Sequence, residues 1–87
     1  MEQVIDVSAL EPPEPLERIL DALADLPPGD CLRVKHRRDP VPLYRMLRDM
    51  GYRWETGRLA PERFEILIWP EDMPHPGGGA EGAAERS

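Results

Sequence analysis

The residue best suited to covalent chemistry in this 87-residue chain is Cys31, its one cysteine. A thiol reacts as its thiolate, which neighbouring cations stabilise and neighbouring acids disfavour. Asp30 directly precedes Cys31, so we expect a raised thiol pKa and a structural role, with sulfur or redox relay through Cys31 as the alternative. One cysteine cannot form an intramolecular disulfide, and two histidines provide no zinc-finger spacing. The sequence therefore predicts no disulfide framework, no metal site and no cofactor.

A basic segment follows the cysteine and is the first candidate for ligand binding. It consists of Arg33, Lys35, His36, Arg37 and Arg38. Such side chains form charge-assisted hydrogen bonds with phosphate or carboxylate groups, and a helix that starts just downstream would add the positive end of its dipole. The segment is therefore a candidate anion site. The alternative is a solvated basic loop whose charges pair with neighbouring acids.

A second candidate surface comes from alternation near the C-terminal end of the sequence. Parity places Leu67 and Trp69 on the same face as Arg53, opposite to the apolar residues of the same strand. An exposed tryptophan and leucine beside a basic residue would form a docking patch for a protein partner. The alternative is that these side chains lie beneath the C-terminal tail.

Two further pairs of residues attract attention but predict little. Met73 and His75 resemble a metal or haem ligand pair, yet they lie in a Pro-Gly segment and no third ligand is near, so we expect no metal there. Glu11 and Glu14 flank a proline loop, and paired carboxylates can perform acid–base catalysis. Placement at the start of a helix explains them more simply.

Charge is distributed unevenly along the chain, whose net charge is -6. Residues 1–30 hold eight acids against one arginine, residues 31–63 nine bases against four acids, and residues 64–87 five acids against one arginine. This split indicates either a basic face for a partner or two halves that neutralise each other in the fold. We expect no nucleic-acid binding, because the overall acidity opposes a phosphate backbone and no aromatic series accompanies the basic segment.

The elements that must position these residues follow from the apolar spacing. Apolar residues from Leu16 to Leu26 recur at the helical spacing, and the stretch from Cys31 to Lys35 alternates as a half-buried strand does. The full prediction is a strand at 4–7, a helix at about 14–26, a strand at 31–35, a helix capped by Asp39 that ends before Gly51, and a hairpin of 52–56 and 63–69 with its turn at 57–61. This βαβαββ order predicts an α/β two-layer sandwich, with a four-stranded mixed sheet covered on one face by two helices.

The same patterns predict the organisation of the chain. Residues 1–70 form one folded domain, and residues 71–87 form a disordered tail rich in Gly, Ala, Pro and Glu. No apolar run approaches the roughly 18 residues of a membrane span, and the N-terminus lacks the features of a signal peptide. We therefore expect a cytoplasmic monomer that does not contact membranes.

The start of the first helix also resembles a known family. The strand Val4-Ile5-Asp6-Val7, the motif Pro13-Glu14-Pro15-Leu16, the turn Leu26-Pro27-Pro28-Gly29 and the ending Phe64-Glu65-Ile66-Leu67-Ile68 carry the resemblance. The chain resembles the TusA/SirA-like superfamily of small sulfur carriers and, within it, the uncharacterised bacterial branch called the twenty-two-forty-nine domain of unknown function. The similarity runs from about Val4 to Trp69.

The resemblance implies the sulfur-carrier fold, and one departure from the family motif bears on the function. The sulfur carriers of this superfamily hold a reactive cysteine in a Cys-Pro-x-Pro motif. Here Pro13, Glu14 and Pro15 match the motif, while Pro12 stands at the position of the cysteine. We therefore expect no enzymatic activity. The expected function is that of a binding module with the sulfur-carrier fold, which binds a protein partner or a small anionic ligand. Relatives in this branch also suggest an accessory role in bacterial nitrogen-oxide or respiratory metabolism.

Overall fold

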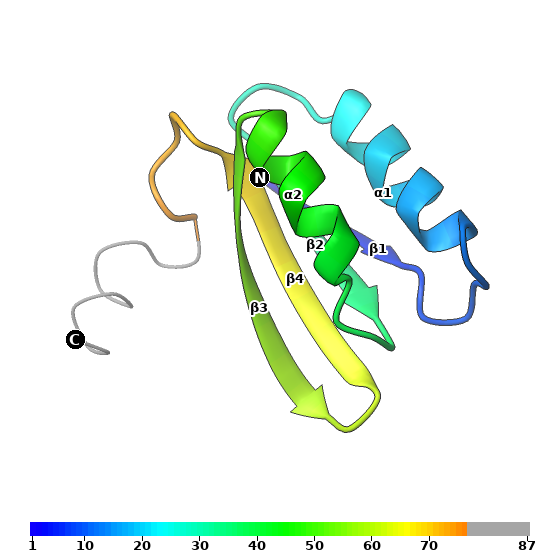
Figure 1. The fold of residues 1–87 in the computed structure, drawn as a ribbon. Coiled ribbons are helices and arrows are strands. Elements are labelled where there is room, and N and C mark those ends of the chain that lie inside the picture. Colours follow the sequence, from blue (N-terminus) through cyan, green and yellow to red (C-terminus); the bar gives the residue numbers. More distant parts are fainter. Residues whose placement is uncertain (77–87) are drawn as a thin grey trace.

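The computed structural model describes residues 1–76, and Figure 1 shows their arrangement. The elements are β1 (Glu2–Asp6), α1 (Glu14–Ala24), β2 (Cys31–His36), α2 (Val41–Asp49), β3 (Tyr52–Ala60) and β4 (Arg63–Pro70). The predicted βαβαββ order and the two-layer sandwich are therefore confirmed. No helix in this part of the chain is long and apolar enough to cross a bilayer.

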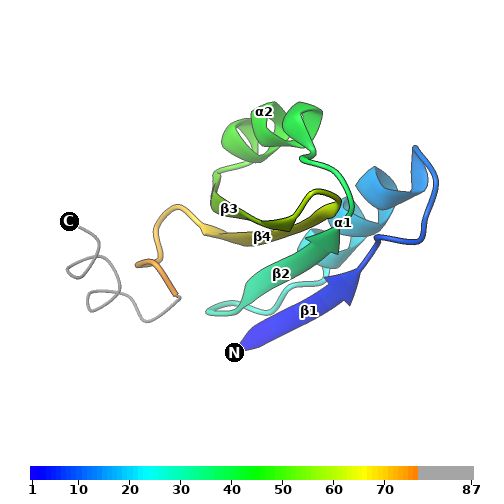
Figure 2. The same cartoon turned by 90° about the horizontal axis from the view of Figure 1, so that it is seen from below.

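The sheet is mixed, with the strand order β1-β2-β4-β3. β1 pairs with β2 in parallel, whereas β4 pairs with both β2 and β3 in antiparallel register. Figures 1 and 2 show both helices on one side of the sheet, with α2 above β3 and β4. Because β1 and β2 run in parallel, their carboxyl ends lie at the same edge, and the chain passes from that edge into each helix.

The core lies between the helices and the inner face of the sheet. α1 contributes Ile19 and Leu23, and α2 contributes Leu43 and Leu47, each pair spaced by four residues so that both side chains point to one side. The other fully buried members of this cluster come from the sheet and the segment after β1, namely Val7, Leu32, Val34, Ile66 and Ile68. Partly buried apolar side chains from the helices and the sheet, among them Leu16, Leu20 and Phe64, pack against this cluster.

A glycine with a positive φ angle lies in each of the two connections that follow the helices. Gly29 (φ 86°) completes the Pro-Pro-Gly turn before β2, and Gly51 (φ 85°) follows the end of α2. These positive φ angles are readily adopted by glycine, since it lacks a Cβ. The predicted end of the second helix before Gly51 is therefore confirmed, whereas the first helix ends at Ala24, slightly before the predicted residue 26.

The hairpin of β3 and β4 differs from its prediction. Residues 57–61 do not form a turn, because Gly57 pairs with Glu65 and Arg58 with Phe64 in a continuation of β3. Gly57 has no positive φ, so it acts as a strand residue, and an irregularity between Arg58 and Ala60 precedes a tight connection. Glycine and proline in this stretch indicated a turn, but the cross-strand pairing extends β3 to the end of the hairpin.

The start of α2 also differs from expectation. Asp39 does not cap the helix, since Pro40 occupies the N-cap position and no side chain makes a capping hydrogen bond. The Asp39 carboxylate instead accepts a hydrogen bond from the Tyr44 hydroxyl, and burial with this contact raises the pKa of Tyr44 to about 12. The Tyr44 ring stacks on Trp54 with a centroid distance of 5.1 Å, which joins α2 to β3.

Residues 71–76, called the strap here, cross the outer face of the sheet. The Glu71 N–H donates to the Gly51 carbonyl at 2.9 Å, and Met73 packs on a small outer cluster of Cys31, Leu67 and Trp69. His75 lies against Trp69, with ring centroids 4.6 Å apart, and its Nε2 lies 3.0 Å from a Glu55 carboxylate oxygen. The predicted disordered tail therefore differs from the structure over 71–76, and the remainder of that prediction, 77–87, lies outside the described residues.

Candidate functional site

An apolar pocket of about 260 Å³ opens where both helices begin, beside the carboxyl end of β2. The segment that starts α1, the end of β2 and the segment that starts α2 form its walls. The lining residues are Pro12, Pro13, Pro15, Leu16, Ile19, His36, Pro40, Pro42 and Leu43. Five of the nine are prolines, which carry no backbone N–H, so the walls expose few polar groups.

His36 is the one titratable side chain among the residues that line this pocket. It follows Leu32 and Val34 in the alternation of β2 and so points to the helix side, where its exposed fraction is 9%. Its Nδ1 accepts a hydrogen bond from the Arg38 N–H at 3.1 Å, which assigns the proton of the neutral ring to Nε2. No residue of 1–76 forms a hydrogen bond with Nε2.

The electrostatics keep this imidazole neutral. Burial lowers the pKa of His36 from its ordinary value of 6.5, and the positive charges of Arg37 and Arg38 lower it further, against a smaller opposing effect of Asp39. The His36 ring is therefore neutral, and it lies between this pocket and a second, polar hollow that Asp6, Lys35 and Glu62 also line.

Both helices begin at the pocket without a side-chain cap. Pro13 and Pro40 occupy the two N-cap positions, and neither makes a side-chain hydrogen bond. The first N–H groups of a helix have no partner within the helix and lie at the positive end of its dipole. At these two starts, however, the N–H groups of Glu14, Val41 and Leu43 donate to the backbone carbonyls of Glu11, Asp39 and Pro40 at 2.8–2.9 Å, and Pro15 and Pro42 have no N–H.

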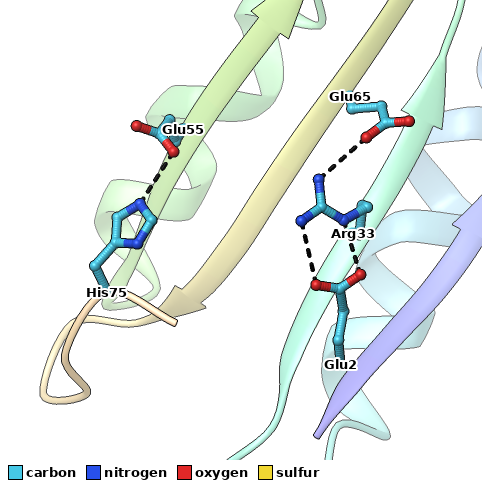
Figure 3. A network of polar contacts seen from close by, with 5 residues as sticks. All are labelled: Glu2, Arg33, Glu55, Glu65 and His75. Atoms are coloured by element: carbon cyan, nitrogen blue, oxygen red, sulfur yellow. Dashed lines mark hydrogen bonds and ion pairs between the residues drawn. The ribbon is translucent and has the colours of Figure 1, made fainter. Parts of the chain in front are cut away.

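The five basic residues predicted as an anion site are not brought together. Arg33 lies on the outer face, where it contacts Glu2 at 2.8 and 3.2 Å and Glu65 at 3.1 Å (Figure 3). Lys35 shares that face by the alternation of β2, so only His36 of the strand residues reaches the pocket.

The remaining two basic residues lie beyond the end of β2. Arg37 pairs with Glu11 at 3.2 Å, and Arg38 is exposed. Both line a separate polar hollow with Glu62. The strand alternation therefore divides the basic segment between two faces and a loop.

The predicted docking patch is not exposed. Leu67 and Trp69 have exposed fractions of 5% and 6%, because Met73 and His75 of the strap lie over them (Figure 3 shows His75 beside Glu55). Arg53 alone of the three is exposed. The sequence left two alternatives, an exposed docking patch or side chains beneath the C-terminal tail. In the structure, Leu67 and Trp69 lie beneath the segment that follows β4.

Cys31 is a free, buried thiol on the outer face. Burial raises its pKa, and the negative charge of Glu2 raises it further, while Asp30 contributes less than expected. The Asp30 carboxylate instead contacts the Met1 ammonium at 2.9 Å and the Gln3 amide at 3.0 Å. Cys31 therefore lies across the sheet from the pocket.

The family-motif residues lie at the pocket, and three of the four line it. Pro12 and Pro13 are exposed at its rim, Pro15 is buried, and Glu14 is exposed in the first turn of α1. Sequence reasoning missed His36, Leu43 and the two prolines at the start of α2 as parts of the same site. The signal was present, since Pro40 and Pro42 repeat at the start of the second helix the spacing that Pro13 and Pro15 have at the start of the first.

Within residues 1–76 there is no group of three or more His, Cys, Asp or Glu side chains arranged to hold a metal ion. Of the two carboxylates at the start of α1, Glu11 forms an ion pair with Arg37 at 3.2 Å.

The family model described as "Uncharacterized conserved protein (DUF2249)" matches residues 4–70. No curated protein and no solved structure matches the chain. The matched range includes every residue that lines the pocket and ends at Pro70, before the strap.

Proposed function

This chain belongs to the family of uncharacterized conserved proteins DUF2249, and from that premise we propose that it is a small binding module whose ligand enters the apolar pocket between the starts of α1 and α2. The single observation that carries the proposal is the pocket itself, with a nine-tenths buried His36 in a wall otherwise made of Pro, Leu and Ile. Ligand sites in proteins have this composition, a mostly apolar concavity with a few placed polar groups.

Binding rather than catalysis is proposed for two reasons. The pocket lining holds one titratable group, whereas proton transfer or covalent chemistry at a site is supported by an activated nucleophile or a second acid or base. The resemblance to sulfur carriers adds that Pro12 stands where those proteins hold their cysteine. We propose that the module keeps the carrier scaffold and uses the cavity beside that position for recognition.

The position of the pocket fits this proposal. It lies outside the carboxyl ends of the parallel strands β1 and β2, and α/β sheets commonly bind ligands at this edge. In the bacterial nitrogen-oxide or respiratory metabolism that the resemblance suggests, such a module would act as an accessory protein of the cytoplasm.

The proposal is tested by NMR titration of labelled protein with small apolar probes, namely hexanol, hexanoate, phenol and benzoate. We expect amide shifts at Leu16, His36 and Leu43, which line the pocket. Pro42→Trp places a bulky ring at the pocket wall and is expected to abolish these shifts. Val41→Trp is the matched control, since Val41 is 61% exposed and does not line the pocket.

Two outcomes contradict the proposal. One is that no probe moves the amides that line the pocket, and the other is that Pro42→Trp responds as Val41→Trp does. A separate assay addresses the alternative of sulfur relay. Persulfide transfer from a cysteine desulfurase that is lost in Cys31→Ser would replace the binding proposal with a relay function.

A further inference from the structure

The outer face of the sheet carries a small apolar cluster formed by Cys31, Leu67 and Trp69. Both helices lie on the other side of the sheet, so no helix of residues 1–76 covers this cluster (Figure 2). Charged residues flank it on the neighbouring strand, where Arg53 is paired with Trp69 and Glu55 with Leu67. The three members of the cluster are nevertheless only 4%, 5% and 6% exposed. The strap supplies the cover that the helices do not.

Met73 is the apolar part of that cover. It is the partly buried hydrophobic side chain that packs on the cluster from outside it. The strap is held besides by a backbone hydrogen bond from Glu71 and by the contacts of the His75 ring with Trp69 and Glu55. Met73 is also partly exposed, so part of its side chain is open to dissolved reagents. The strap thus packs on the cluster through an oxidisable group that solvent reaches.

A thioether in this position has a defined reaction with peroxides. The sulfur lone pair attacks one oxygen of hydrogen peroxide, the O–O bond breaks, and the other oxygen leaves as water after proton transfer. The sulfur is oxidised to the sulfoxide and the peroxide is reduced. A sulfoxide is polar, and its burial in an apolar contact without a hydrogen bond is unfavourable. Oxidation of Met73 therefore weakens the contact that holds the strap on the cluster.

The other sulfur groups of the chain do not have this combination of access and cover. Met1, Met46 and Met50 are 88%, 36% and 47% exposed, and none of them packs on the outer cluster. Cys31 is buried, and its burial and the charge of Glu2 raise the pKa of its thiol, so little of the reactive thiolate is present. Met73 differs from all of these because it is both accessible and placed over the thiol.

We propose that Met73 is a site of reversible oxidation by peroxide, and that its sulfoxide releases the strap and uncovers Cys31. Methionine sulfoxide reductases return the sulfoxide to the thioether, so the strap can close again. Burial is the first cause of the raised pKa of the Cys31 thiol, so opening of the strap increases the thiolate fraction as well as the access. The site lies across the sheet from the pocket, and the proposal does not depend on what the pocket binds.

The experiment compares the full chain with Met73→Leu and Met46→Leu before and after treatment with hydrogen peroxide. Catalase removes the peroxide, mass spectrometry locates the sulfoxides, and the reagent dithiobis(nitrobenzoate) measures the reaction rate of Cys31. We expect the oxidised unaltered chain to react about fivefold or more faster than the untreated chain, since the loss of one packed contact increases local opening by such a factor. Met46→Leu, the matched control, should show the same increase. Met73→Leu keeps an apolar side chain there and should show almost none, although its other methionines are oxidised.

Two further measurements test the cause of the increase. Met73→Gln places a polar side chain at the contact without any oxidant, and it is expected to react faster than the unaltered chain before peroxide is added. Treatment of the oxidised unaltered chain with methionine sulfoxide reductase should return the rate to that of the untreated chain. This second measurement uses no substitution, so it stands whether or not the variants fold.

Three outcomes overturn the proposal. The first is an unaltered chain that carries the sulfoxide at Met73 and reacts at the untreated rate. The second is an equal increase in Met73→Leu and the unaltered chain, which would assign the effect to other oxidised groups. The third is oxidation of Cys31 by peroxide before Met73, which would mean that the strap does not shield the thiol.

Discussion

His36 links the chemistry of the pocket to the stability of the fold. Its folded-state pKa lies below 6.5, mainly because it is buried. In the unfolded chain the ring takes up a proton near its ordinary pKa of about 6.5, while in the folded chain it stays neutral to lower pH. The unfolded state therefore binds more protons in the interval between the two pKa values.

The first prediction follows from this difference in proton binding between the folded and unfolded states. The stability contribution is complete above pH of about 6.5 and is lost as the pH falls through this value towards the folded pKa of His36. We expect the melting temperature to decrease between pH 7.5 and 5.5, and to decrease less in His36→Gln. Circular dichroism melts measure this, with His75→Gln as the control. Equal pH dependence in His36→Gln and the unaltered chain would show that His36 is not held neutral.

The second prediction compares two leucines of α1. Leu23 is 3% exposed, whereas Leu20 is only partly buried against the core. Leu23→Ala is expected to reduce the free energy of unfolding by about 2–5 kcal/mol, as a core cavity does, and Leu20→Ala by less. Urea denaturation of the two variants measures both losses. A larger loss at Leu20 would mean that the helix is rotated relative to the sheet.

At the scale of elements, the strap stands out because it covers an apolar surface on the outer face of the sheet. Met73 packs on Cys31, Leu67 and Trp69, and a hydrogen bond from Glu71 to Gly51 fixes the start of the strap. These contacts keep the Cys31 thiol at 4% exposure.

A chain that ends at Pro70 is therefore expected to be less stable than one that ends at Pro76, which keeps every contact described. The difference should be about 1–3 kcal/mol in the free energy of unfolding, the scale of burying one large apolar side chain. The Cys31 thiol should also react faster with a thiol reagent in the shorter chain. Identical stability and reactivity of the two chains would show that the strap does not protect this face.

Most elements were predictable because their signals are local. The spacing of apolar residues in α1 and the alternation of β2 are properties of short stretches, and both patterns indicated the right face for each residue. Gly57 was misleading for the same reason, since its turn signal is local whereas its pairing with Glu65 depends on the partner strand.

The candidate site was harder to predict because it is not local. Its walls come from residues 12–19 and 36–43, which the fold brings together at the edge of the sheet. Each wall has an ordinary role when considered separately, as a proline-rich helix start or the end of a strand. The strap was predicted only as one of two alternatives for Leu67 and Trp69, because a Pro-rich segment with one methionine and one histidine carries too weak a pattern to predict where it packs.

At the scale of the whole molecule, the acidic and basic parts of the sequence neutralise each other only in part. Arg33 with Glu2 and Arg37 with Glu11 join the two parts. By contrast, the exposed acids of α1 and its C-cap form no ion pair within residues 1–76. These acids are Glu14, Glu17, Asp21 and Asp25. The surface therefore keeps an acidic ridge along α1.

The sheet edges indicate how the molecule behaves at high concentration. An antiparallel pair of β1 strands centred on Val4 would place Glu2 opposite Asp6 of a second copy, and like charges in such positions repel. β3, the other edge, carries exposed charges at Arg53, Glu55 and Arg58 and an irregularity near its end. We therefore expect a monomer of 9.9 kDa in sedimentation equilibrium at 0.15 M salt. A dimer under these conditions would mean that charge does not block the edges.

The two tryptophans, placed on opposite faces of the sheet, give the protein two separate optical probes. Trp54 stacks on Tyr44 beneath α2, and Trp69 lies against His75 under the strap. In a Trp69→Phe variant the tryptophan fluorescence comes from the helix side alone, and in a Trp54→Phe variant from the strap side alone. Events on either side of the sheet can therefore be followed in solution without any attached dye.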